Sequence, residues 1–552
     1  MTAPHPTGAK SLRRLLICSL ISFGLLIVLL YAVRTPLHTY LGSVTGEEEG
    51  WEQVKGFGRL LLLRLGRPPL QLAAEVPIGN AGVNPYGVNT FLEQEVDAHK
   101  LELAMRMIRD AGFRWIRQEF PWEDIEQSGR GDFWDHKWNI SAWDKYDRIV
   151  DLATRYDLHL IVRLDNPPAW SREVGDAMGT RAPPDGFEDY GNFVAEVVSR
   201  YRGKVQHYQI WNEPNIYPEW GEQPVDAQAY TRLLQVAYTR AKQADPDCII
   251  LSAGLAQTTE TGPMNVSDLT FLQQMYDAGA KGYFDIMGVM AYGLWTGPGD
   301  RRTSLELTNF SRPQLVREIM VRNGDADKPL WATEVGWNAL PVDSTATPIF
   351  GRVTLEQQAR YAVQAYTRAQ QEWPWMGVLN YWFFKRATDT ENDQPFYYFR
   401  LVEPDFAPLP AYHAMKTLTS QPSSLHVGYH QESHWALQWD GAWQKVSDAS
   451  AVLGQLARST QAGDSLSFTF VGTELQLIVH SGPNGGTLRA IIDGRTDREI
   501  SLHSDAETYG VPITLVRHWR SAARTVLLTN EGENGTYVDV DGLRVRNAGA
   551  LW

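Results

Sequence analysis

Two acidic residues, Glu213 and Glu334, stand out because each ends a short run of strand-forming residues. Glu213 lies in "YQIWNEPN" (208–215), and Glu334 lies in "PLWATEVGW" (329–337). Proline disfavours the α conformation in the residue before it, so Pro214 predicts an extended Glu213 at the strand end. Two carboxyl groups that meet in one site can divide a bond-breaking reaction between them. One donates a proton to the leaving oxygen, and the other attacks the carbon atom.

The stretch between residues 82 and 419 predicts the frame that brings these acids together. Short apolar strands alternate with amphipathic helices and give eight strand–helix units. Eight units within about 340 residues match a (β/α)₈ TIM barrel with loop insertions. A doubly wound open sheet is the competing α/β fold, but such sheets usually carry a glycine-rich phosphate loop after the first strand. This chain has no such loop there, so the sequence favours the barrel.

Barrel enzymes carry their catalytic residues at the carboxyl ends of the strands. The predicted strands place Arg117 at the end of the second strand, Asn212 and Glu213 after the fourth, Tyr292 after the sixth and Glu334 at the end of the seventh. Two acids so placed fit glycoside hydrolysis, in which retention of configuration needs about 5–5.5 Å between the carboxyl groups. Apolar neighbours are expected to raise the pKa of Glu213, whereas Arg117 and Tyr292 are expected to favour ionised Glu334.

The motifs "WNEP" and "ATEVGW" resemble the signatures of retaining glycoside hydrolases of clan A. The resemblance covers the whole barrel, and "WIRQEFPW", "NPPAW" and "PAYHAM" look most like glycoside hydrolase family 39 and its relatives that act on bacterial exopolysaccharides. This resemblance implies that Glu213 is the general acid/base and that Glu334 is the nucleophile. One position departs from it, because clan members often have His-x-Tyr after strand six, whereas this chain has Met290-Ala291-Tyr292.

The same resemblance implies roles for four further residues. Asn212 is expected to hydrogen-bond the sugar 2-hydroxyl, Tyr292 to orient Glu334, Arg117 to support the nucleophile, and Trp382 to form the floor of the subsite at the cleaved bond. Tryptophans on strand-end loops can also stack on sugars. The candidates for stacking are Trp122, Trp170, Trp220, Trp295 and Trp337. At least half of them are expected to be scaffold, because tryptophan is often simply buried, and Trp170 and Trp337 are predicted to contact substrate.

The amino-terminal end of the chain predicts a transmembrane helix that anchors the protein. Residues 15–33 are 19 positions without a charge, close to the ~20 that span a bilayer. Lys10, Arg13 and Arg14 precede this segment, and the positive-inside rule keeps residues 1–14 in the cytoplasm. The alternative is a cleaved signal peptide, which usually has an apolar core of about 7–15 residues and a small-residue cleavage site. Residues 34–78 are then a juxtamembrane linker, and the catalytic domain, residues 79–420, faces the cell exterior or periplasm.

Beyond residue 424 the pattern changes to short alternating strands. Examples are "DSLSFTFVG" and "ELQLIVHSG", which turn residues separate from their neighbours. Residues 424–552 are therefore predicted to form an all-β sandwich domain, a candidate carbohydrate-binding module. Trp435, Trp439 and Trp443 are expected to be exposed in this domain, where they can stack on sugar.

Composition narrows the choice of partners and functions. The net charge of −14 argues against nucleic acid, which requires an electropositive face. The chain has two cysteines, so no disulfide framework is expected, and no metal or cofactor is predicted. Two functions remain open. One is a membrane-tethered retaining glycosidase that cleaves an extracellular poly- or oligosaccharide. The other is a catalytically silent glycan-binding or scaffold protein with a barrel fold. The two acids, with Asn212 and Tyr292, favour the enzyme.

Overall fold

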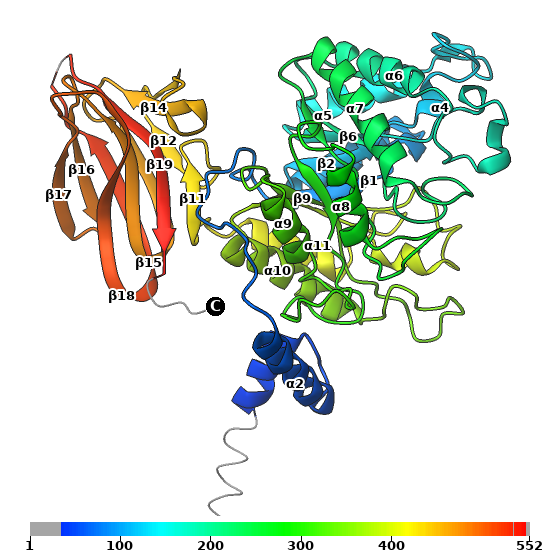
Figure 1. The fold of residues 1–552 in the computed structure, drawn as a ribbon, viewed down its shortest axis with the longest axis horizontal. Helices are drawn as coiled ribbons and strands as arrows, with labels where there is room; N and C mark the ends of the chain where they lie inside the picture. Colours follow the sequence, from blue (N-terminus) through cyan, green and yellow to red (C-terminus); the bar gives the residue numbers. More distant parts are fainter. Residues whose placement is uncertain (1–34, 534, 548–552) are drawn as a thin grey trace, which may run out of the picture. The chain divides into compact units, whose positions relative to one another are not determined.

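The computed structural model describes residues 35–533 and 535–547, which divide into two compact units (Figure 1). The smaller unit holds residues 35–69 and 299–302. It contains helical residues 35–45 and helix α2 (Gly50–Gly66). Among the described residues, no helix is both long enough and apolar enough to cross a membrane. The predicted transmembrane segment, residues 15–33, lies outside the described residues.

The larger unit contains the predicted barrel, whose described strands form an eight-stranded parallel sheet. In order around the sheet these strands are β7 (Ile249–Leu251), β6 (His207–Ile210), β5 (His159–Leu164), β2 (Trp115–Glu119), β1 (Tyr86–Thr90), β10 (Met376–Tyr381), β9 (Leu330–Val335) and β8 (Met287–Met290). Parallel bridges from Leu251 to Ile286 and from Leu255 to Val289 join β7 to β8 and close the barrel. Because all of these strands run the same way, their carboxyl ends meet at one mouth.

Helices surround these strands (Figure 1). They are α3 (Ala98–Asp110), α4 (Trp122–Ile125), α5 (Asp144–Arg155), α6 (Phe187–Arg200), α7 (Ala227–Ala244), α8 (Asp268–Asp277), α9 (Pro313–Arg322), α10 (Leu355–Glu372) and α11 (Pro410–Thr419). Two short strands, β3 (Trp134–Asp135) and β4 (Ile140–Ser141), pair in the loop after β2. Several helices begin at a side-chain cap. Asp97 caps α3, Asp226 caps α7, and Thr354 forms a capping box with Gln357 at α10.

The carboxyl-terminal domain is all-β, as predicted, but its strands do not divide into the two sheets of a sandwich. They are β11 (Gly428–Gln431), β12 (Gln438–Asp440), β13 (Gln444–Ser447), β14 (Gln455–Ser459), β15 (Ser465–Ser481), β16 (Thr487–Ile492), β17 (Thr496–Ser501), β18 (Thr508–Asn530) and β19 (Val538–Arg546). In the described residues they form one antiparallel nine-stranded sheet that curves as a half-barrel. The reason is length: β15 and β18 have 17 and 23 residues, and register shifts let them bend while they stay paired.

The three tryptophans of this domain that were expected to be exposed are half-buried, so that prediction is wrong. Trp439 and Trp443 contact each other with ring centroids 4.6 Å apart and pack against the core of the β domain. The Trp435 ring lies 6.1 Å from that of Tyr86, and its backbone N–H donates to the Gly82 carbonyl at 2.8 Å. Tyr86 is the first residue of β1. The β domain therefore contacts the barrel at the end opposite the mouth.

Candidate active site

Glu334 is held in place by two side chains, Arg117 from β2 across the barrel and Tyr292 from the end of the adjacent strand β8. It lies within β9 and is 5% exposed. Its Oε1 accepts a hydrogen bond from Nη1 of Arg117 at 2.9 Å, and its Oε2 accepts one from the Tyr292 hydroxyl. Burial, followed by the charge of Glu334, raises the pKa of Tyr292, so the phenol keeps the proton that it donates. Both carboxyl oxygens of Glu334 therefore have a hydrogen-bond donor, and one of these donors is a cation.

Arg117 connects four polar side chains beneath the mouth. Besides Glu334, its guanidinium donates to Gln209 Oε1, Asn89 Oδ1 and Asn212 Oδ1, each at 2.7 Å. Arginine presents a planar fork of donors, and here every nitrogen of the fork has an acceptor. Sequence reasoning identified Arg117 and Asn212 but missed Gln209 and Asn89. A polar residue inside an otherwise apolar strand is the signal that could have found both, since both are buried.

The backbone at Glu213 differs from the predicted extended conformation. Trp211 and Glu213 have positive φ angles of +71° and +41°, in the left-handed region. Two hydrogen bonds to neighbouring strand ends hold this turn: Trp211 N–H donates to the Leu164 carbonyl at 3.0 Å, and Glu213 N–H donates to the Gly254 carbonyl at 3.2 Å. These tertiary contacts override the local preference that Pro214 imposes. The chain turns sharply after β6, and the Glu213 side chain remains partly exposed.

The pKa of Glu213 is raised well above its ordinary range. Burial is the largest cause, and the negative charges of Glu334 and Glu219 add to it. Arg117 and Arg181 act in the opposite direction but do not cancel these effects. The surroundings of Glu213 therefore favour its protonated form. The negative charge of Glu334 acts on Glu213, so the two acids share one electrostatic environment.

Glu219 is a member of this site that sequence reasoning missed. Its carboxylate pairs with Arg181 and accepts a hydrogen bond from the Asn212 side chain. Its backbone carbonyl accepts the indole N–H of Trp211 at 2.8 Å. Burial raises the pKa of Glu219 as well. Only the folded loop after β6 brings this residue back beside Asn212, so strand-end spacing gave no signal for it.

The tryptophan candidates fall into different environments. Trp382 directly follows β10, is half-buried, and has its ring 5.5 Å from that of Phe91. Trp170 is also half-buried, and its indole N–H donates to the Glu126 carbonyl at 2.8 Å. Trp337 is 0% exposed, and its indole N–H donates to the Thr296 carbonyl at 2.7 Å. The prediction that Trp337 contacts substrate is wrong in this structure, because packing covers the whole side chain.

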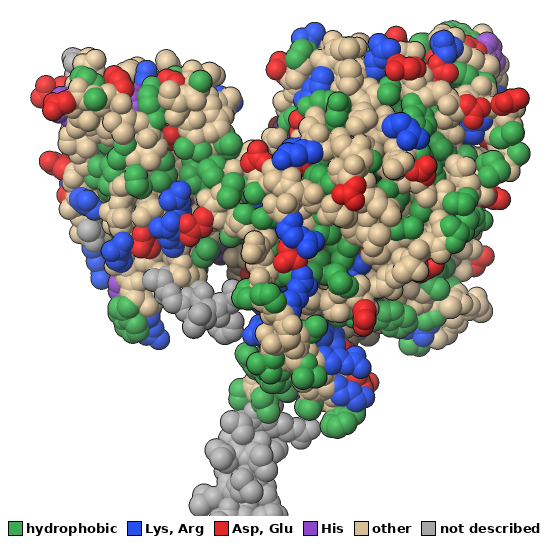
Figure 2. Space-filling view, viewed as in Figure 1, with side chains coloured by type: hydrophobic (Ala, Val, Ile, Leu, Met, Phe, Trp, Pro, Cys, Tyr) green, Lys and Arg blue, Asp and Glu red, His purple; other side chains and the backbone are tan. Residues whose placement is uncertain are grey.

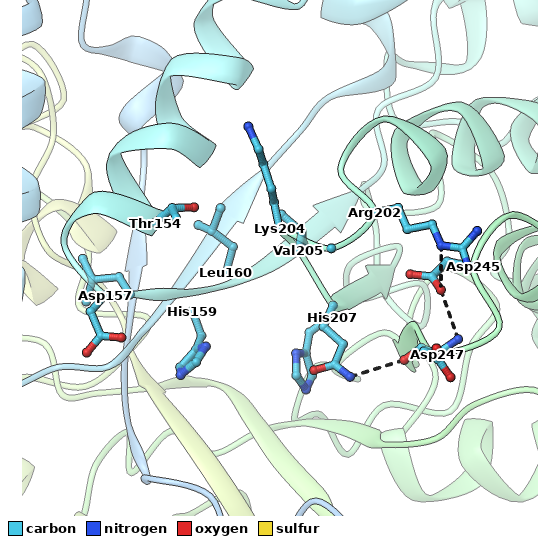
Figure 3. Close-up of a pocket in the computed structure, with 13 residues that line it drawn as sticks. Thr154, Asp157, His159, Leu160, Arg202, Lys204, Val205, His207, Asp245 and Asp247 are labelled. Carbon is cyan, nitrogen blue, oxygen red and sulfur yellow. Dashed lines mark hydrogen bonds and ion pairs between the residues drawn. The ribbon is translucent and has the colours of Figure 1, made fainter.

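A pocket at the amino ends of the strands is separate from the acid pair (Figure 3). Its lining includes His159 and His207, the first residues of β5 and β6, together with Asp245 and Asp247 before β7. Burial lowers the pKa of His207 to about 3, so this imidazole is neutral. Polar groups at this end of a barrel serve stability, whereas chemistry occurs at the carboxyl ends. In the described part of the chain, no cluster of three or more His, Cys, Asp or Glu side chains could hold a metal ion.

A family model, Cellulase (glycosyl hydrolase family 5), matches residues 76–277. The matched stretch includes Glu213 and its turn but ends before β8, so Glu334 lies outside it. Together with the closed parallel barrel and the acids at the ends of β6 and β9, this match defines the class of the protein. The chain is a glycoside hydrolase barrel of clan A, and it hydrolyses O-glycosyl bonds.

Solved structures with a similar fold include a family 39 glycoside hydrolase, a β-xylosidase and a GH5_18 protein. A family 39 glycoside hydrolase from Bacteroides cellulosilyticus WH2 is 18% identical, with 83% of each chain covered and a TM-score of 0.47. A β-xylosidase from Caulobacter crescentus CB15 is 15% identical, with 83% of this chain and 98% of that chain covered and a TM-score of 0.43. A GH5_18 protein from Bifidobacterium longum subsp. infantis is 15% identical, with 63% and 81% covered and a TM-score of 0.47. These likenesses do not indicate the sugar that this chain cleaves.

Proposed function

We propose that the chain is a membrane-anchored glycosidase that retains configuration by double displacement. Glu334 is the nucleophile, and Glu213 is the general acid and then the general base. The observation that carries this proposal is the contrast between the two acids at one barrel mouth. Arg117 and Tyr292 donate to the two carboxyl oxygens of Glu334, while burial and neighbouring negative charge raise the pKa of Glu213. A retaining glycosidase needs this division between an ionised nucleophile and a protonated acid.

The remaining residues of the mouth take supporting roles in this proposal. Asn212 is fixed between Arg117 and Glu219, so its side chain is positioned to hydrogen-bond the sugar 2-hydroxyl. Tyr292 and Arg117 orient Glu334 through one hydrogen bond to each of its carboxyl oxygens. Trp382, which is only half-buried at the end of β10, forms the floor beneath the reacting sugar. Trp170 is half-buried on the loop after β5 and supplies a more distant aromatic contact.

The substrate in this proposal is an extracellular poly- or oligosaccharide. Residues 15–33 form the transmembrane anchor, which places the barrel outside the cytoplasm. The β domain contacts the barrel away from the mouth, so it leaves the substrate path open and serves as a spacer or carbohydrate-binding module.

The stereochemistry of the first product tests the retaining mechanism. An aryl glycoside that the enzyme cleaves is followed by proton NMR within the first minutes of reaction. Double displacement inverts the anomeric carbon twice, so the first sugar released is expected to have the anomeric configuration of the substrate. A first product of opposite configuration would mean that Glu334 activates water instead of attacking the sugar.

The pH profile of the enzyme is expected to move in opposite directions in two variants of the Glu219 pair. The charge of Glu219 raises the pKa of Glu213, and Arg181 lowers it. Glu219→Gln removes the negative charge, so Glu213 loses its proton at lower pH and the alkaline limb of the kcat/KM profile shifts to lower pH. Arg181→Gln removes the positive charge, so that limb shifts to higher pH. The alkaline limb reports the acid of the free enzyme. Equal profiles for the two variants would show that this pair does not act on Glu213.

A further inference from the structure

Helix α2 carries an apolar face that points away from the rest of its unit. Five large side chains on the helix are between 45% and 85% exposed: Trp51, Val54, Leu61, Leu62 and Leu65. With 3.6 residues per turn, their positions fall within an arc of about 100°. Solvent-facing helix surfaces in soluble proteins are normally polar. This surface is apolar along the length of the helix.

The opposite face of α2 already has its partners. Gln53, Gly56 and Leu60 are buried on that side. The side-chain amide of Gln53 donates to the Glu47 carbonyl at 2.9 Å, and a Cβ added at Gly56 would lie 3.1 Å from the Thr45 side chain. The residues of α2 that are buried in the small unit lie on this inner face. The outer apolar face is largely exposed.

Basic side chains border the outer apolar face. Lys55 and Arg59 lie along one edge and Arg64 lies beyond the other, and all three are exposed. Figure 2 shows hydrophobic and basic side chains close together on this small unit. Helices that lie in a membrane surface combine an apolar face with flanking Lys and Arg, which meet anionic headgroups.

The position of the helix in the chain indicates which apolar phase covers it. The uncharged segment 15–33, long enough to span a bilayer, ends just before the first helical residues, 35–45. Those residues also expose Leu37 and Tyr40. Helix α2 contains Arg59 and Arg64 near its centre and end, so it is not itself a spanning helix. A segment of this kind next to a predicted span lies close to the lipid surface.

We propose that α2 lies flat in the lipid–water interface, with Trp51, Val54, Leu61, Leu62 and Leu65 buried about 5–10 Å below the headgroups. The small unit is then a second membrane contact, in addition to the predicted span. A flexible tether would let the unit tumble above the bilayer, whereas an interfacial helix fixes it at the surface.

Site-specific fluorescence in the full-length chain tests this proposal. The chain carries Cys18→Ser and one new cysteine, at Leu62→Cys or Arg64→Cys, labelled with a nitrobenzoxadiazole dye; Cys248 is buried and does not label. Each protein is reconstituted into vesicles of phosphatidylcholine with about one quarter phosphatidylglycerol, with or without doxyl-labelled lipid. Quenching at position 62 is expected to exceed that at position 64 on the same helix by about threefold or more. Val342→Cys, on an exposed barrel loop, is expected to show none.

Equal quenching at positions 62 and 64, or none at 62, would overturn the proposal. The dye at position 62 could instead be shielded from water to a degree that depends on protein concentration but not on the doxyl-labelled lipid. This result would assign the apolar face to contact with a second copy of the chain and would also overturn the proposal. A chain that does not float with vesicles would contradict both this proposal and the proposed anchor. If the chain floats with vesicles but the dye at position 62 is not quenched, only the proposed interfacial helix is contradicted.

A second variant checks that the apolar face causes the insertion. Leu61→Glu, Leu62→Glu and Leu65→Glu are combined, and the dye is placed at Val54→Cys. Quenching at position 54 is expected to fall to the level of Val342→Cys, because charged groups resist transfer into the acyl region. Hydrolysis of a soluble aryl glycoside is expected to be unchanged. Quenching that persists at position 54 would show that this face does not hold the helix in lipid.

Discussion

Glu334→Ala is expected to lower kcat/KM for every glycoside by more than about 10⁴-fold, because loss of a nucleophile removes the covalent route entirely. Added azide can then attack the sugar from the vacated face. The expected product is a glycosyl azide of inverted configuration, formed in a single displacement. The measurement combines steady-state rates with proton NMR of the azide product.

A matched control for this variant is Glu356→Ala. Glu356 lies exposed in the first turn of the outer helix α10 and is not a hydrogen-bond partner of either acid, so its removal is expected to leave kcat/KM within about twofold of the parent enzyme. Circular dichroism and thermal unfolding should show that both variants are folded. Near-normal hydrolysis by Glu334→Ala would remove this residue from the mechanism.

Glu213→Ala is expected to show losses that depend on the leaving group. General acid–base help is worth about 10²–10⁴-fold, so poor leaving groups should lose that much in kcat/KM. Activated aryl glycosides need little protonation and should still form the glycosyl–enzyme, which then accumulates because no base activates water. Azide should release it with retained configuration. The measurement is a series of aryl glycosides of graded leaving-group pKa, with product NMR.

The two azide products separate the roles of the acids. If azide gave the inverted product with Glu213→Ala and the retained product with Glu334→Ala, Glu213 would be the nucleophile and Glu334 the acid. Equal losses across all leaving groups in Glu213→Ala would instead show that Glu213 maintains the fold of the mouth and donates no proton.

Strand-end reasoning predicted the barrel and the positions of the polar residues, because period and length are local properties of the chain. The connections among those residues are not local. Arg117 contacts side chains from three other strands and the turn after β6, so its partners depend on barrel closure and register. The backbone of Glu213 likewise depends on a hydrogen bond to Gly254, which lies 41 residues further along (254 − 213).

Residue type alone also does not decide burial. Trp382 and Trp337 both follow barrel strands, but Trp337 packs among Phe310 and Tyr361 and is covered, whereas Trp382 remains half-buried. In the β domain, alternating strands predicted an all-β fold. Long strands can either bend within one sheet or divide between two sheets. The outcome depends on register shifts such as the one between Gly472 and Glu474, and strand periodicity does not predict such shifts.

The proposal that Glu334 attacks the sugar is tested most directly by the mass of the enzyme itself. Glu213→Ala is mixed with an activated aryl glycoside, quenched in acid, and analysed by intact mass and peptide mapping. The expected result is an added mass of one glycosyl residue on the peptide of β9, attached at Glu334, and its loss after azide is added. An adduct on any other residue, or no adduct while the aryl group is still released in a burst, would contradict the proposed mechanism.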